Sequence, residues 1–178
     1  MAVDQHRVLG VRWVEEEAYV DLLVDGKSVL ELIPDVADRI TPLAKRWLRE
    51  PVLERAAAFL GQRENASPLG PDQIELAVCP QCGDLGCGGV IARLTVTDTE
   101  VVWEDVQWTL DRENEFDELP APEPLAQAFP ARIVFDRKQY EAALSSALEM
   151  LATGPWCVPP PSESWNRRLR RLLGFARQ

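Results

Sequence analysis

The chain has 178 residues, of which 46% are hydrophobic and 27% are charged, and its formal net charge is −10. This composition is typical of one globular domain with a real core, and it excludes wholesale disorder. The acidity disfavours general nucleic-acid binding, because phosphate contacts need Lys and Arg. No uncharged apolar run reaches the roughly 18 residues of a membrane span, and the start of the chain lacks the regions of a signal peptide. We therefore expect a cytoplasmic protein.

The first segments have the pattern of short strands joined by tight turns. Val8–Val14 and Ala18–Val24 are rich in Val, Leu and aromatic residues, and we expect them to pair as antiparallel strands. Asp25-Gly26 is a strong signal for a turn. Ser28, with a Glu three positions later, has capping-box spacing and predicts a short helix that ends before Pro34.

A helical region follows. Thr41-Pro42 is a good helix start, with Thr as the N-cap and Pro at the first helical position. The apolar residues of Leu43–Leu60 have helical spacing, but Pro51 interrupts them, so the pattern predicts two helices or one kinked helix. A loop over 62–73 then leads to a strand at Ile74–Cys79.

The next elements are predicted to form a hairpin. Val90–Val96 and Glu100–Leu110 are its two arms. Simple alternation places Trp103 and Asp105 on one face of the second arm and Trp108 on the other face.

The C-terminal third begins with an acidic, Pro-rich segment at Asp111–Pro130, which we expect to be a surface loop. The segment Ala131–Phe135 is predicted to form a short strand. Asp136, with Gln139 three positions later, is predicted to cap a helix over 137–152. Its apolar stripe consists of Tyr140, Ala143, Leu144, Ala147 and Leu151.

These elements together predict an α+β fold. We expect an antiparallel sheet of five or six strands, with the helices near 42–60 and 137–152 packed on one face. A single domain would span 1–153, followed by a Pro-rich spacer at 154–161 and a basic amphipathic helix at 162–178.

The charge is divided unevenly between these parts. Residues 1–160 have a balance of −14 and residues 161–178 a balance of +4. The acidic residues gather between 98 and 123, where they form either a solvated surface or a docking surface for a basic protein. The terminal helix either docks on the body or remains free to meet a membrane surface or an acidic partner. The candidate partner-binding residues are Asp98, Glu100, Glu104, Asp105, Glu113, Glu115, Asp117, Glu118, Arg167, Arg168, Arg170 and Arg171.

A cysteine cluster is the most unusual local feature. Its first part, Cys-Pro-Gln-Cys-Gly at 79–83, has the form of half a zinc knuckle. The candidate metal ligands are Cys79, Cys82, Cys87 and Cys157. His6, Asp84 or solvent could replace the last of these. Three interpretations stay open: a structural zinc, reduced thiols that only pack, and a redox pair or disulfide.

Catalysis has little support in the sequence. The chain has one His, near the N-terminus, so no general base is evident for a Ser or Cys nucleophile. No phosphate-binding Gly motif is present. We therefore expect a non-enzymatic protein-binding module, of the immunity or antitoxin kind, that uses its acidic surface. The alternatives are a zinc-stabilised adaptor and a thiol oxidoreductase.

Five segments carry a family resemblance. They are 22–32 (LLVDGKSVLEL), 82–88 (CGDLGCG), 92–96 (ARLTV), 101–105 (VVWED) and 134–144 (VFDRKQYEAAL). With these motifs the chain resembles a family of bacterial proteins of unknown function, over about residues 18–150. The chain departs from the family pattern at Val106, in 41–60 and in the Arg-rich tail. The resemblance implies one domain with a characteristic cysteine turn, and it implies no activity.

Overall fold

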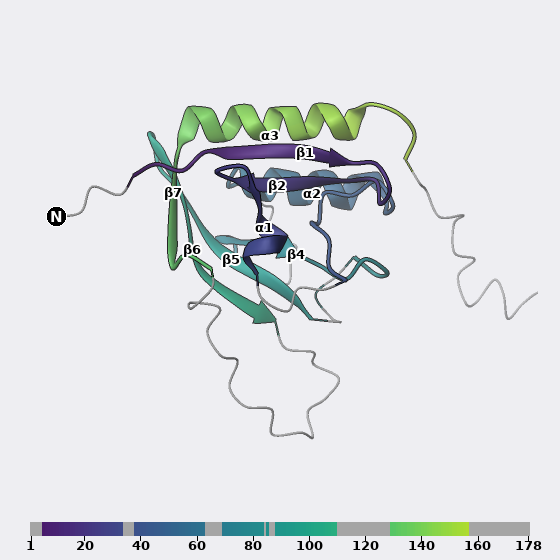
Figure 1. Cartoon of the computed structure of the whole chain (residues 1–178), viewed down its shortest axis with the longest axis horizontal. Helices are drawn as coiled ribbons and strands as arrows, with labels where there is room; N and C mark the ends of the chain where they lie inside the picture. The colour runs from purple at the N-terminus through teal and green to yellow at the C-terminus, as the bar shows by residue number, and fades with distance from the viewer. Residues whose placement is uncertain are drawn as a thin grey trace, which may run out of the picture.

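The computed structural model describes residues 5–33, 38–62, 69–83, 85, 88–109 and 129–156. These residues form an α+β fold with two antiparallel sheets (Figure 1). The first sheet has the order β1 (Leu9–Val14), β2 (Tyr19–Val24) and β3 (Lys27–Ser28). The second has the order β4 (Gln73–Ala77), β5 (Gly89–Val96), β6 (Glu100–Thr109) and β7 (Arg132–Asp136). The helices are α1 (Val29–Leu32), α2 (Arg49–Phe59) and α3 (Arg137–Ala152).

The first hairpin confirms the local sequence signals. β1 and β2 pair antiparallel, with Leu9 opposite Val24. Asp25 and Gly26 both have positive φ angles, 51° and 82°, as a two-residue hairpin turn requires. The Ser28 hydroxyl accepts a hydrogen bond from the Leu30 N–H at 3.2 Å and so caps α1 as predicted.

The expectation of a helix that begins at Thr41 is wrong. The buried Thr41 hydroxyl instead donates to the Val20 carbonyl at 2.6 Å, so this residue ties its segment to β2. The helix begins later, at Arg49. Pro51 therefore lies in the first turn of α2, where the backbone N–H groups have no partner within the helix, and it does not break the helix.

The strands do not form the single sheet that the sequence predicted; the described strands divide between two sheets. The sheets meet where the Arg7 N–H donates to the Val134 carbonyl at 2.7 Å, beside β7. The β1–β2 hairpin does not extend the other sheet, because its apolar residues Val20 and Leu22 pack into a core that both sheets share. Figure 1 shows α3 lying along β1.

An irregularity in β6 corrects the expected alternation. The pairing with β5 shifts between Ile91 and Arg93, and Asp105 has a φ angle of 51°. The additional residue reverses the alternation, as β-bulges do. Val106 and Trp108 therefore pack against the core on the same side as Trp103, and Asp105 is exposed.

The predicted cap and buried stripe of α3 are confirmed. The Asp136 carboxylate accepts a hydrogen bond from the Gln139 N–H at 2.9 Å. The Gln139 side chain also binds both backbone groups of Leu9, donating to its carbonyl at 2.5 Å and accepting from its N–H at 3.0 Å. The buried residues on this helix are Tyr140, Leu144, Ala147 and Leu151, and the remaining predicted residue, Ala143, is partly buried against the same core.

Other predictions lie outside the described residues. They include the acidic loop after Thr109, the Pro-rich spacer beyond Trp156 and the basic terminal helix with Arg167, Arg168, Arg170 and Arg171. Among the described helices, none has the length and apolar character needed to cross a bilayer.

Candidate functional site

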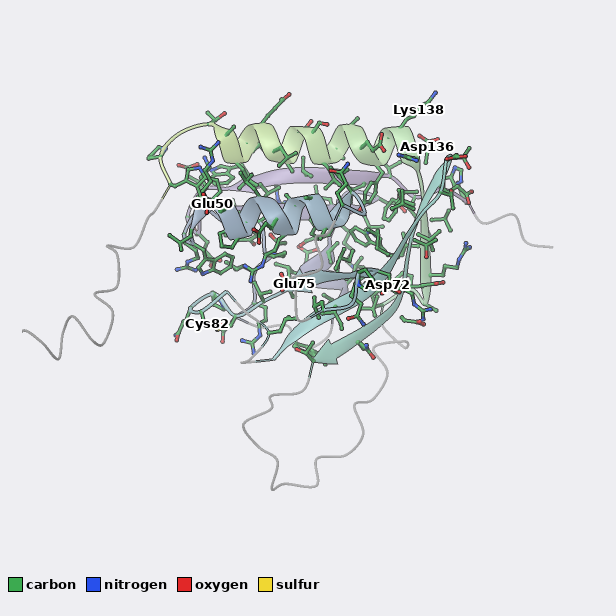
Figure 2. All side chains as sticks on the ribbon, turned by 180° about the vertical axis from the view of Figure 1, so that it is seen from behind. Glu50, Asp72, Glu75, Cys82, Asp136 and Lys138 are labelled. Carbon is green, nitrogen blue, oxygen red and sulfur yellow. The ribbon has the colours of Figure 1, made fainter. Side chains whose placement is uncertain are left out.

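The Cys-Pro-Gln-Cys-Gly segment forms a closed turn directly after β4. The Gly83 N–H donates to the Cys79 carbonyl at 2.9 Å, which closes the turn. Gly83 has a φ angle of 72°, in the left-handed region that glycine adopts without strain. Both thiols are free of disulfide bonds, with Cys79 buried and Cys82 exposed. Figure 2 shows Cys82 on a loop at the end of the molecule opposite to Asp136 and Lys138.

Two residues from the α2 region hold this turn in place. A Cβ atom on Gly83 would lie 2.5 Å from Cε2 of Trp47, so the indole ring packs directly on the glycine. The Arg55 guanidinium lies over the same ring, 5.8 Å from its centroid, and donates to the Gly83 carbonyl. Arg55 also forms an ion pair with Glu75, with Nε and Oε2 2.7 Å apart. The turn is therefore fixed between β4 and α2.

Only some of the predicted metal ligands lie in the described part of the chain. Cys79 and Cys82 share the turn, whereas Cys87, Cys157 and Asp84 lie outside the described residues. Within the described ranges, no group of three His, Cys, Asp or Glu side chains is arranged to hold a metal ion.

His6 lies elsewhere in the fold. Its Nε2 is 2.8 Å from Oε1 of Glu100, at the turn between β5 and β6. The cysteine turn is at the other end of β5, and a strand of this length spans roughly 26 Å. This separation removes His6 from the candidate ligands.

The acidic strip is partly neutralised by the chain itself. Glu100 pairs with His6, Asp105 pairs with Arg93, and Glu104 lies 3.9 Å from Arg132. Asp98 is exposed in the turn before β6. The remaining acidic candidates, Glu113, Glu115, Asp117 and Glu118, lie outside the described residues. The described part of the strip therefore includes arginines beside its carboxylates and is not a bare acidic surface.

Sequence reasoning missed the residues that support the turn. Glu75 is 8% exposed and lies between the apolar residues Ile74 and Leu76 of β4, and a charged residue at such a position signals a buried partner. That signal was present in the sequence. The partner of Glu75 is Arg55, which lies 20 residues earlier, and only the fold brings the two side chains together.

Comparison with known proteins identifies no relative of this chain. The chain matches no protein-family model, no curated protein and no solved structure. The resemblance to a bacterial family therefore stays a prediction, and a function has to be inferred from the geometry of this chain.

Proposed function

We propose that the chain is a non-enzymatic binding module whose cysteine turn is stabilised by a structural zinc ion. The observation that carries this proposal is the turn from Cys79 to Gly83, which places two cysteine side chains, neither of them in a disulfide bond, three residues apart on a closed backbone loop. Thiolates with this spacing are typical of structural zinc sites. The contacts of Trp47 and Arg55 fix the turn before any ion arrives, which lowers the entropic cost of binding.

Cys87 is the proposed third ligand. The described residues on either side of it are joined by a hydrogen bond, since the Gly88 N–H donates to the Leu85 carbonyl at 3.0 Å, and Gly88 has a φ angle of 76°. This turn leads into β5, which is paired with β4 directly before Cys79. The segment that carries Cys87 is therefore connected at both ends to the region of the turn.

Cys157 is the proposed fourth ligand. The Lys45 ammonium group donates to the Thr153 carbonyl at the end of α3. Two residues further on, Trp47 packs against Gly83 of the cysteine turn. One short segment thus contacts both the end of α3 and the turn. Cys157 is four residue steps along the chain from Thr153, and four steps span at most about 14 Å.

The partner of the module is proposed to be a basic protein. Its attraction would come mainly from Glu113, Glu115 and Asp117, because the described residues Asp105 and Glu104 already have arginine neighbours. Reversing these three charges should weaken a complex that is captured from native cells. Reversal at Asp105, whose carboxylate already pairs with Arg93, is the control. Binding that is indifferent to salt and to the triple reversal would contradict this proposal.

Metal analysis tests the zinc site directly. Protein purified without chelator should contain about one equivalent of zinc, and Cys82→Ser should lose most of it. Gln81→Ala is the control, because it changes an exposed residue of the same turn that is not a proposed ligand. Less than roughly a tenth of an equivalent would contradict the proposal. An unreactive, metal-free pair would also exclude a thiol oxidoreductase, the alternative function of these cysteines.

A further inference from the structure

A polar hollow lies next to the cysteine turn. Its volume is about 470 Å³, within the range of small-molecule sites. It is bounded by the β1–β2 turn, the segment before Thr41, the segment before α2, and the cysteine turn. The lining residues are Glu17, Tyr19, Asp38, Arg39, Ile40, Arg46, Pro80 and Gln81.

Backbone hydrogen bonds join the walls of this hollow to one another. The Lys45 N–H donates to the Ala18 carbonyl at 2.8 Å, which connects the wall with Arg46 to the wall with Glu17 and Tyr19. Ile40 and Val78 exchange two hydrogen bonds, of 3.2 and 2.9 Å, which connect the wall with Arg39 to the cysteine turn. The hollow is therefore formed before any ligand enters, and a ligand would not have to order its walls.

The charges around the hollow have both signs. Glu17, Asp38 and Arg46 make no ion pair within the described ranges, although they line the same space. Several other carboxylates of the described chain pair closely with arginines, as in Arg12–Asp21 at 2.6 Å. Opposite charges that border one hollow without touching are complementary to a molecule that carries both.

Tyr19 adds a hydrogen-bond donor to the wall. Burial raises the pKa of its phenol, and the nearby carboxylates of Asp21 and Glu17 raise it further, while Arg12 lowers it. The hydroxyl is therefore protonated at neutral pH and can donate to an anionic group.

We propose that this hollow binds a small zwitterion of amino-acid size. Its carboxylate would bind the Arg46 guanidinium and the Tyr19 hydroxyl, and its ammonium group would bind the carboxylates of Glu17 and Asp38. This site does not depend on the zinc proposal, because its charged residues are not metal-ligand candidates.

A titration with defined probes tests the site. The twenty free amino acids are added separately to the full-length protein, and binding is followed by calorimetry and by amide chemical shifts. Acetate, methylammonium and inorganic phosphate are the probes that carry only one kind of charge. We expect at least one amino acid to bind with a Kd of about 1 mM or lower. It should bind more tightly than all three single-charge probes.

Variants then locate the site. Arg46→Gln and Glu17→Gln should each weaken that amino acid at least tenfold, as loss of a charged hydrogen bond does. The matched controls are Arg49→Gln and Glu16→Gln, which change exposed neighbours outside the hollow. Thermal unfolding of each variant verifies that it folds. The proposal is overturned if no amino acid binds with a Kd of about 1 mM or lower, if phosphate or acetate binds as tightly, or if the control variants lose binding equally.

Discussion

Gly83→Ala is expected to destabilise the protein through two separable effects. The glycine has a φ angle of 72°, and an L-residue in this region costs about 1–2 kcal/mol. The added methyl group would also lie 2.5–2.8 Å from three atoms of the Trp47 ring. Overpacking of this kind costs about 1–3 kcal/mol. The free energy of unfolding should therefore fall by about 2–5 kcal/mol.

Urea unfolding followed by tryptophan fluorescence measures this loss, with the fully buried Trp103 as one of the reporters. Gly26→Ala is the matched control, because Gly26 has a φ angle of 82° but no atom within 4 Å of the added carbon. This control should lose only the part of the free energy of unfolding that comes from the positive φ angle. In a Trp47→Ala background, Gly83→Ala should cost no more than this control. A Gly83→Ala loss equal to that of Gly26→Ala in the wild-type protein would refute the packing of Trp47 on the turn.

Three further predictions concern single residues of the body. Ala18→Gly should raise the free energy of unfolding by about 1 kcal/mol in the same urea assay, because Ala18 has a φ angle of 54°; a decrease would contradict it. Tyr140→Phe should lower that free energy by about 2–4 kcal/mol, since it leaves the buried Trp103 indole N–H and the Phe59 carbonyl without this partner; an unchanged urea midpoint would contradict it. The Val8 N–H and then Arg7 lower the pKa of Asp25, while burial opposes them, so its ionised form stabilises the fold above roughly pH 4. The stability difference between wild-type protein and Asp25→Asn should therefore shrink as the pH falls below roughly 4 in unfolding curves; a difference that does not change with pH would contradict it.

The sequence predicted the local elements that depend on near neighbours. The tight turn at Asp25-Gly26 depends only on the positive φ angles of these two residues. The side chains of Ser28 and Asp136 accept hydrogen bonds from backbone N–H groups two and three residues later. The contacts that decide these structures lie within the same short segment. Such signals can be recognised without knowing the rest of the fold.

Features that depend on distant partners were not predictable in the same way. Thr41 has the local sequence of a helix cap, but its hydroxyl binds the Val20 carbonyl 21 residues earlier. The bulge at Asp105 depends on how β6 pairs with β5. The alternation of apolar and polar residues along β6 alone does not reveal it. The division into two sheets likewise follows from how the β1–β2 hairpin packs on the shared core.

The candidate site shows the same division. The spacing of Cys79 and Cys82 was visible in the sequence, because the turn that they share is local. The support from Trp47 and Arg55 and the neighbouring hollow were not, since they combine segments from several parts of the chain. The acidic strip was recognised by its charge, but the pairing partners of its described residues came only with the fold.

X-ray absorption at the zinc edge of the purified full-length protein tests the proposed zinc site, because it identifies the atoms bound to the metal. We expect zinc coordination dominated by sulfur at about 2.3 Å. This sulfur signal should diminish in Cys82→Ser and persist in Gln81→Ala. A shell of only nitrogen or oxygen at about 2.0–2.2 Å, or a protein without zinc, would contradict it.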